Sequence, residues 1–232
     1  RIDYIFYTST RFAVRSTFVD DRKNDFYSLS VYKYLCTLFP KINSVWVNKP
    51  NTKIKISKIK KKKIDILIAF RIYFIFKKNF LNKVKLLSLN FHPGPPRYRG
   101  FGCANYALFN NDKSYGVSAH LIDDKIDHGQ ILDVEKFLIK KNYNLSDLLK
   151  KTHSTQVKQC KRIISRMCDL NFNLKNYLLK YPCEEKWSKK LYSKKNLDKF
   201  YEIDRKISKN DFYNKLRSTR IENHKDILTN NF

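Results

Sequence analysis

Two polar side chains close an apolar run in the middle of the chain. Asn90 and His92 stand at the end of Leu86–Phe91, whose length and apolar character are typical of a buried strand, and Pro93-Gly94-Pro95-Pro96 follows. Because residues two apart on an extended chain project to the same side, Asn90 and His92 share one face. The prolines and the glycine fix the turn beyond them. This pattern predicts a rigid mount for both side chains.

A carboxylate follows on a loop further along the chain. Tyr115–Ile122 is predicted to be a second strand, and Asp127 lies in the loop after it. If the two strands pair, Asp127 comes within reach of His92, and an amide, an imidazole and a carboxylate converge. These groups suit acyl-type transfer to a nitrogen nucleophile: the amide donates to a developing oxyanion, the imidazole handles a proton, and the carboxylate orients or charges the imidazole. Taken singly, an Asn or a His near a strand end is more often structural.

The order of these residues matches a known pattern. It consists of Asn90-Phe91-His92-Pro93, then Tyr98-Arg99-Gly100, then Tyr115-Gly116-Val117-Ser118-Ala119-His120, then Ile126-Asp127 with Gly129 and Ile131. This pattern resembles the folate-dependent formyltransferases, which include methionyl-tRNA formyltransferase, glycinamide ribonucleotide formyltransferase and the nucleotide-sugar N-formyltransferases. The Pro-rich turn and the Gly-Cys-Ala-Asn-Tyr-Ala sequence after it are closest to the sugar-type branch.

The resemblance implies a fold and a reaction. The fold is a Rossmann-like α/β domain with a mostly parallel sheet flanked by helices. The reaction transfers a formyl group from the co-substrate N10-formyltetrahydrofolate to a primary amine, here the amino group of a nucleotide-linked amino sugar. In that family's catalytic triad, Asn90 would hold the carbonyl oxygen, His92 would handle the proton, and Asp127 would tune His92 and assist the proton relay.

The resemblance also implies a folate pocket after the strand predicted at Ile64–Phe70. Backbone groups there can read the edge of the pterin ring, which needs hydrogen bonds more than particular side chains. Lys77 stands where relatives usually have a proline, so the loop geometry stays open, and the aromatic side chains of this loop are equally well explained as core residues. The folate contacts implied are Ile72, Tyr73, Phe74, Ile122 and Asp123.

Three residues beyond the turn are predicted to bind the substrate, namely Arg97, Arg99 and Asn105. The two arginines flank the predicted cleft, where a guanidinium can form charge-assisted bonds with a phosphate or with the carboxylates of a folate tail. Exposed, solvated arginines are the equally acceptable alternative.

Composition limits the class of protein. The chain has 232 residues, of which 42% are hydrophobic and 15% aromatic, so it fits one α/β domain with an appendage and is not disordered. We divide it into a catalytic domain at 1–181, compressed in its N-terminal part, and an appendage at 182–232.

No apolar run is long enough to span a bilayer, and five cysteines without a CxxC pair indicate reduced thiols in a cytoplasmic protein. The chain opens on Arg1 rather than Met, which leaves its start open.

The net charge of +27 favours attraction to anionic substrates. Nucleic acid is a weaker interpretation, because lysines outnumber arginines and no RNA-binding motif is present. Methionyl-tRNA formyltransferase is nevertheless an alternative, although the chain lacks the length for that enzyme's separate β-barrel domain. The expected partner is a small-molecule amine, without a membrane and with a possible homodimer.

Two further alternatives stay open. One is a metal-dependent hydrolase that would use His92, Cys103, His120, Asp127 and His128, although no pair of these has a recognised ligand spacing. The other is a non-catalytic remnant of the family.

Periodicity and cap residues predict the remaining elements. A first strand is expected at Ile2–Tyr7, a lysine-rich surface run at Lys53–Lys63, and a long helix that Ser146 caps. The other predictions are a strand at Ser44–Val47 and helices at Ser28–Phe39, Phe101–Phe109 and Leu170–Leu179, with a last helix that Ser208 caps and that carries Arg217 and Arg220 near its end.

Overall fold

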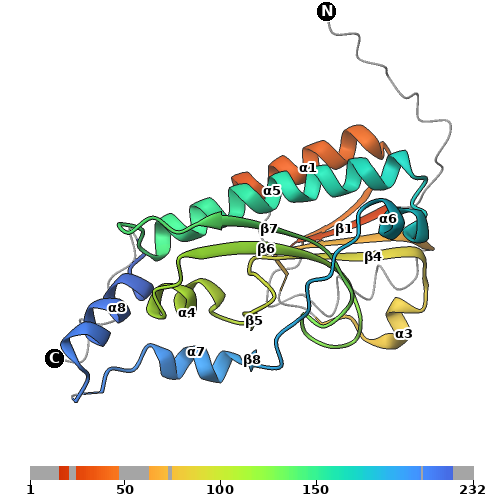
Figure 1. The fold of residues 1–232 in the computed structure, drawn as a ribbon. Helices are drawn as coiled ribbons and strands as arrows, with labels where there is room; N and C mark the ends of the chain where they lie inside the picture. Colours follow the sequence, from red (N-terminus) through yellow and green to blue (C-terminus); the bar gives the residue numbers. More distant parts are fainter. Residues whose placement is uncertain (1–15, 21–24, 47–62, 73–74, 205, 222–232) are drawn as a thin grey trace, which may run out of the picture.

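A six-stranded sheet forms the centre of the molecule (Figure 1). The computed structural model describes residues 16–20, 25–46, 63–72, 75–204 and 206–221. The first four strands in spatial order run parallel, whereas the last two are antiparallel to their neighbours. The predicted α/β class with a parallel-rich sheet is therefore confirmed. In spatial order the strands are β2 (Asn43–Trp46), β1 (Ser16–Asp20), β3 (Ile64–Phe70), β4 (Val84–His92), β6 (Ser114–Leu121) and β7 (Ile131–Leu138).

Helices flank the sheet. Figure 1 shows α1 (Phe26–Leu38) and α5 (Leu145–Asp169) side by side over one face. On the opposite face, Phe80 of α3 (Lys78–Leu81) packs with Ile64 and Leu67 of β3. The remaining elements are α4 (Cys103–Phe109), α6 (Leu174–Lys180), α7 (Lys194–Phe200) and α8 (Lys209–Thr219), and the short parallel pair β5 (Arg99–Gly100) and β8 (Leu191–Tyr192).

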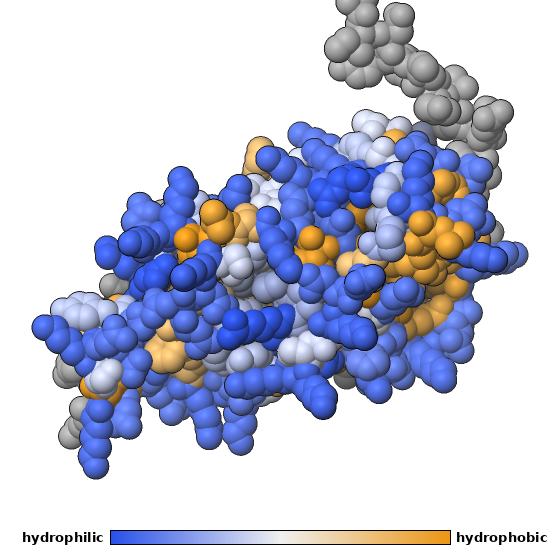
Figure 2. Space-filling view, in the orientation of Figure 1, coloured by the Kyte–Doolittle hydropathy of each residue, from blue (hydrophilic) through white to orange (hydrophobic). Residues whose placement is uncertain are grey.

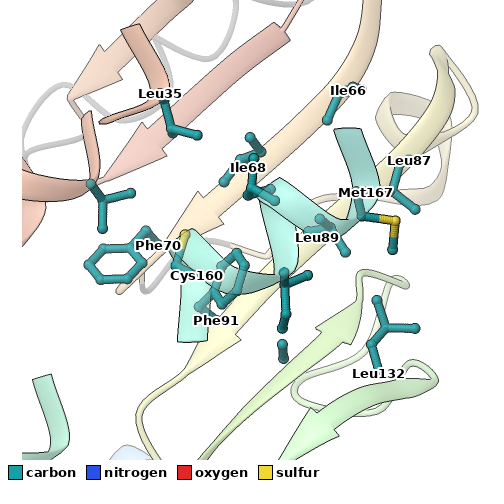
Figure 3. Packing of buried hydrophobic residues seen from close by; sticks show 14 of the residues in the cluster. Leu35, Ile66, Ile68, Phe70, Leu87, Leu89, Phe91, Leu132, Cys160 and Met167 are labelled. Carbon is teal, nitrogen blue, oxygen red and sulfur yellow. The ribbon is translucent and has the colours of Figure 1, made fainter. Parts of the chain in front are cut away.

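The strand β3 lies at the heart of the core. All of its residues are buried, as expected for a short β-branched run bounded by polar residues, and its predicted bounds are confirmed. Ile68 and Phe70 pack with Leu35 of α1 and Cys160 of α5 (Figure 3). Burying an aliphatic or aromatic side chain of this size contributes about 1.5–3 kcal/mol, so this layer holds β3 and its neighbour β4 firmly in place.

The long helix α5 begins earlier than predicted. Asn144, not Ser146, is its N-cap: the side-chain oxygen of Asn144 accepts the N–H of Asp147 at 3.0 Å, and the Asp147 carboxylate accepts the N–H of Asn144 at 3.1 Å. This reciprocal capping box satisfies two backbone donors at once, whereas Ser146 is buried inside the first turn. The prediction of Ser146 as the cap was wrong because a better pair lies just upstream.

Several other elements are confirmed with shifted ends. The helix predicted at Ser28–Phe39 is α1, capped by Asp25, and Ser208 caps α8 as predicted. The helix α6 begins after Asn173 rather than at Leu170. Two strands of the six-stranded sheet, β1 and β7, were not predicted, and neither was the short pair β5 and β8. The predicted strand Ile2–Tyr7 and residues 53–62 of the lysine-rich run lie outside the described residues.

The surface matches the composition. The face seen in Figure 2 is mostly hydrophilic, with apolar side chains gathered in separate patches, mainly toward the end where α6 lies. Within the described part of the chain, no helix combines the length and the apolar character needed to cross a membrane.

Candidate active site

The register between β4 and β6 brings the first two candidate residues into contact with β6. This pairing sets Asn90 opposite His120 and His92 opposite Ser118. Asn90 Nδ2 donates to His120 Nε2 over 3.0 Å, while His120 Nδ1 donates to the Leu121 carbonyl over 2.7 Å. His120 Nε2 is therefore the accepting nitrogen. The Asn90 amide keeps a second N–H that a ligand can accept.

Asp127 completes the group, as expected from the pairing of the two strands. Its Oδ2 lies 3.2 Å from His92 Nδ1, and its Oδ1 lies 3.6 Å from His120 Nε2. The backbone N–H of Gly100 also donates to Oδ2, over 2.8 Å. The convergence of amide, imidazole and carboxylate predicted from the sequence is confirmed; the chemical roles of the three residues stay predictions.

The pair His92 and Asp127 can accept one proton. Burial lowers the pKa of His92 despite the attraction of Asp127, so its imidazole is neutral at pH 7. Burial alone would raise the pKa of Asp127, but His92, His120 and the Gly100 N–H outweigh it and lower that pKa to about 2. Since His92 Nε2 donates to the Tyr98 carbonyl over 2.8 Å, the lone pair of neutral His92 is on Nδ1, facing the carboxylate. A proton that arrives at Nδ1 is thus held between imidazole and carboxylate.

Arg99 fixes the backbone on which Asp127 sits. Asp127 adopts a left-handed conformation with φ of 41°, which is uncommon for a residue other than glycine. The Arg99 guanidinium donates to the carbonyls of Asp127, over 2.6 Å, and Ile126, over 2.8 Å. A third bond, over 3.1 Å, reaches the carbonyl of Ser188 far along the chain. The geometry gives Arg99 a role in holding the loop of Asp127.

Asn90, His92 and Asp127 all line one cavity of about 470 Å³. This volume lies within the range of roughly 300–1,000 Å³ that small-molecule sites occupy. The cavity is also lined by His153 of α5 and by Tyr201, the residue that caps the C-terminus of α7. A substrate of moderate size therefore has room beside the three converging groups.

Some of the predicted folate and substrate contacts line the cavity, whereas others do not or lie outside the described residues. Ile72, Ile122, Asp123 and Asn105 belong to the cavity lining, whereas Tyr73 and Phe74 lie outside the described residues. Asn105 is also tied to the C-terminal helices, because its Nδ2 donates to Tyr201 Oη over 3.0 Å and to the Ser218 carbonyl over 2.8 Å.

Arg97 is not in the cavity lining. Its side chain is 67% exposed, and its guanidinium donates to Asp112 Oδ1 over 3.2 Å. Arg217, near the end of α8, donates to the Tyr143 carbonyl and to Asn111. Both arginines thus hold surface turns together in this structure, and the predicted binding role of Arg97 receives no support from its position.

Two residues that the sequence analysis did not single out support the site from other elements. Gln156, buried in α5, donates to the carbonyl of Phe91 over 2.5 Å, next to His92. Trp187 donates its indole N–H to the Gly129 carbonyl over 2.7 Å. A polar residue within the apolar stripe of α5 is a signal that could have identified Gln156; nothing in the local sequence marks Trp187.

The metal alternative has no geometric support in the part of the chain that the structure describes. Within those residues, no three His, Cys, Asp or Glu side chains are arranged to hold a metal ion. Cys103, one of the candidate ligands, donates its thiol to the carbonyls of Tyr98 and Gly100, each over 3.3 Å. Burial, chiefly, raises the pKa of Cys103 far above its usual range, which keeps it a thiol.

Comparison with known protein families shows which family the chain belongs to. The family model described as formyl transferase matches residues 46–164, just over half of the chain. The chain belongs to the formyl transferase family. The matched residues include Asn90, His92 and Asp127, whereas Trp187 and Ser188 lie beyond them.

The curated relatives of this formyl transferase chain include two kinds of protein. The chain is 30% identical over 161 residues to the bifunctional polymyxin resistance protein ArnA of Wigglesworthia glossinidia brevipalpis, covering 69% of this chain and 23% of that protein. It is 30% identical over 142 residues to the methionyl-tRNA formyltransferase of Mycoplasmopsis pulmonis, covering 61% of this chain and 47% of that enzyme. The chain therefore spans less than half the length of these relatives.

Solved structures share the fold over nearly the whole chain. A sugar N-formyltransferase from Shewanella superposes with a TM-score of 0.69 at 17% identity, covering 93% of this chain and 92% of that one. An N-formyltransferase from Helicobacter canadensis, solved with folinic acid and dTDP-3-aminofucose, has a TM-score of 0.65 at 17% identity, covering 88% and 80%. At these identities the likeness establishes the fold, including elements after β7.

Proposed function

We propose that the chain transfers a formyl group from N10-formyltetrahydrofolate to a primary amine. The observation that carries this proposal is the convergence of Asn90, His92 and Asp127 on one cavity, with His92 Nδ1 and Asp127 Oδ2 3.2 Å apart, in a member of the formyl transferase family. The bound folate would supply an electrophilic formyl carbon. The residues of the chain supply the rest of the chemistry.

His92 and Asp127 act together on the proton of the amine. An amine that attacks a carbonyl becomes positively charged and must lose a proton. The neutral imidazole with its lone pair toward ionised Asp127 is suited to receive that proton, and the imidazolium that results is the form that stabilises negative charge nearby. A protonated His92 therefore arises during the reaction, whereas the free protein holds the neutral form at pH 7.

Asn90 donates to the carbonyl oxygen as negative charge develops there. Its amide is oriented by His120, so one N–H is committed and the other is held in a fixed direction. A preorganised donor of this kind typically stabilises a transition state by about 2.7–4 kcal/mol. His120 thus acts through Asn90 and need not touch the substrate.

The cavity fits the folate co-substrate by its size and by its lining. Apolar side chains of Ile72, Ile75 and Ile122 supply apolar surroundings of the kind that an aromatic ring needs. Asp123 lies on the same loop as Asp127 and also lines the cavity, which supports the predicted contact with folate. The Helicobacter canadensis neighbour holds folinic acid in the same fold, which supports this assignment further.

We propose a nucleotide-linked amino sugar as the acceptor. Solved neighbours that match this chain over about nine-tenths of its length include sugar N-formyltransferases, and one of them binds dTDP-3-aminofucose. The second candidate acceptor is methionyl-tRNA, because curated relatives carry that activity in their names and the chain has a net charge of +27. Ionic strength can distinguish the two acceptors, because the binding of a tRNA weakens steeply as the salt concentration rises.

The test begins with calorimetric titration of the chain with 5-formyltetrahydrofolate, followed by transfer assays with N10-formyltetrahydrofolate. The acceptors are a panel of dTDP- and UDP-linked amino sugars and, in parallel, methionyl-tRNA at increasing salt. We expect folate binding and formylation of one sugar class, detected by mass spectrometry. His92→Ala and Asp127→Ala should abolish transfer, whereas Tyr213→Ala, at an exposed position outside the cavity, should not.

Two outcomes would change the proposal. A well-folded chain that binds no folate analogue would identify a family member without the family's activity. Formylation of methionyl-tRNA but of no amino sugar would replace the proposed acceptor and leave the chemistry intact.

A further inference from the structure

The chain returns to the active site after α6. This returning segment (residues 182–190) leads from α6 to β8 (Figure 1) and lies outside the matched family region. Ser188 anchors it twice, since its N–H donates to the Pro96 carbonyl over 3.0 Å and its carbonyl accepts from Arg99 over 3.1 Å. Lys136 of β7 forms an ion pair with Glu185 at 2.5 Å. The segment is thus held at three places around the site.

Trp187 is the residue of this segment that reaches the histidines. Its ring lies 5.7 Å from the ring of His92 at 74° and 5.1 Å from the ring of His120 at 88°, both edge-to-face. Its indole N–H is fixed by the Gly129 carbonyl, two residues after Asp127. Trp187 is half-buried and is not among the residues that line the cavity. It therefore packs against both imidazoles without occupying the space for substrates.

We infer that Trp187 is a positioning residue, which holds the rings of His92 and His120 in their reactive orientation and keeps water away from the His92–Asp127 pair. This inference rests on the proposed function and deepens it. Edge-to-face packing restrains the rotation of an imidazole about its side-chain bonds, and the fixed indole N–H links that restraint to the loop that carries Asp127. One side chain thereby controls both partners of the proton-accepting pair.

Because His92 is buried away from water, its titration reports whether the indole of Trp187 shields it. The charged and titratable groups that face His92 are Asp127 on its loop, His120 of β6, Arg99 of β5 and Cys103 of α4. Burial is the dominant cause of the lowered pKa of His92. Removing the indole lets water reach the ring, so the titration of His92 should move up toward its ordinary value. A side chain with a merely structural role would leave this titration unchanged.

The experiment compares Trp187→Ala and Trp187→Phe with Lys186→Ala in the full chain. Lys186 is the exposed neighbour on the same segment, so its variant controls for changes in the segment itself. Histidine titrations are followed by NMR with labelled histidine, and binding of 5-formyltetrahydrofolate by calorimetry. Trp187→Phe keeps an aromatic ring but loses the bond to the Gly129 carbonyl, so it should show a smaller effect; it also serves if Trp187→Ala does not fold.

We expect Trp187→Ala to raise the titration midpoint of His92 and to lower kcat roughly ten- to hundredfold with little change in KM, because only the reactive geometry is loosened. Lys186→Ala should resemble the wild type in every measurement. An unchanged His92 titration in both Trp187 variants would overturn the inference, as would a loss of folate binding with an unchanged kcat. The NMR measurement needs no turnover, so a chain that formylates nothing would refute the proposed function and still report on Trp187.

Discussion

Gly100 donates its backbone N–H to the Oδ2 atom of Asp127 over 2.8 Å, and the same oxygen lies 3.2 Å from His92 Nδ1. Gly100 has a φ of +87°, and a Cβ at this position would lie 2.2 Å from the Tyr192 carbonyl oxygen. The donor can therefore reach Asp127 only because the residue is glycine. A fixed backbone dipole thus supports the carboxylate on one side while the imidazole approaches from the other.

Replacing Asp127 by Asn should separate its charge from its geometry. The amide oxygen of Asp127→Asn can take the place of Oδ2 and still accept the Gly100 N–H, so the carboxamide keeps the shape of the carboxylate beside His92 Nδ1. The negative charge that stabilises the imidazolium is lost, so kcat should fall roughly 10²- to 10⁴-fold while the folate analogue still binds. Steady-state kinetics together with calorimetry check this. A wild-type kcat in this variant would remove Asp127 from the proton relay.

Asp127 should also contribute to stability in a defined acid window. Its pKa is about 2 in the folded chain against an ordinary value of 3.8, so the unfolded chain binds more protons between these values. The contribution, about 2 kcal/mol, is complete above pH 3.8 and is lost as the pH falls toward about 2. Urea unfolding across this window should show a steeper loss for the wild type than for Asp127→Asn. Equal slopes would mean that the carboxylate is not stabilised by folding.

His92 should make the folded chain less stable as the pH falls below 6.5, its ordinary pKa. Burial lowers the pKa of His92 in the folded state, so the unfolded chain takes up the proton first. The loss continues until the imidazole is protonated in the folded chain as well. His92→Gln has no such proton to bind, and its free energy of unfolding should depend less on pH in this range. A wild type and a variant with the same pH dependence would contradict the buried neutral imidazole.

Arg99→Lys should loosen the loop of Asp127, and Arg97→Lys provides the matched control. A lysine cannot reproduce the fork that donates to three carbonyls, and each charged hydrogen bond contributes about 1.5–3 kcal/mol. We expect Arg99→Lys to lower the free energy of unfolding by about 2 kcal/mol and to reduce kcat. The exposed pair of Arg97 with Asp112 should contribute only about 0–1 kcal/mol. Thermal unfolding and kinetics of both variants decide between a positioning role for Arg99 and a solvated surface arginine.

Gly94→Ala should disturb His92 directly. A Cβ at Gly94 would lie 2.7 Å from His92 Nε2 and 3.1 Å from Cys103 Cβ, so the imidazole would have to leave the Tyr98 carbonyl. Overpacking of this kind typically costs about 1–3 kcal/mol. Gly116→Ala is a fitting comparison, because its Cβ would lie 2.8 Å from the Glu135 carbonyl oxygen on β7. Both variants should be destabilised, but Gly94→Ala alone should shift the NMR resonances of His92; resonances unmoved in both would contradict the close contact.

The elements predicted well are those whose signal is local. Ile64–Phe70 is a short β-branched run bounded by polar residues, and its strand has the predicted bounds. The contact of His92 with Asp127 followed from the expected pairing of their two strands, which the structure shows to be antiparallel. By contrast, β1 (Ser16–Asp20) has the sequence STFVD, with too few apolar residues to stand out from its surroundings.

What the sequence did not reveal depends on contacts between distant segments. Trp187 meets His92 and His120 across large separations in the chain, and no local pattern encodes such a packing. Arg99 looks like a ligand-binding arginine by its residue type, yet three backbone carbonyls occupy its guanidinium. The edge strand β7 was not predicted because its alternation of apolar and polar residues holds only from Leu132 to Glu135 and breaks at Lys136.

The order in which the site is synthesised follows from the returning segment. Asn90, His92 and Asp127 precede Trp187, and 60 residues separate Asp127 from Trp187 (187 minus 127). At roughly 5–20 residues per second, a ribosome needs about 3–12 s to add that length. During this interval the ribosome also adds α5, whose Gln156 supports the strand that carries His92, and Trp187 follows it. The surroundings of His92 and Asp127 can therefore be completed only after the C-terminal part of the chain has been made.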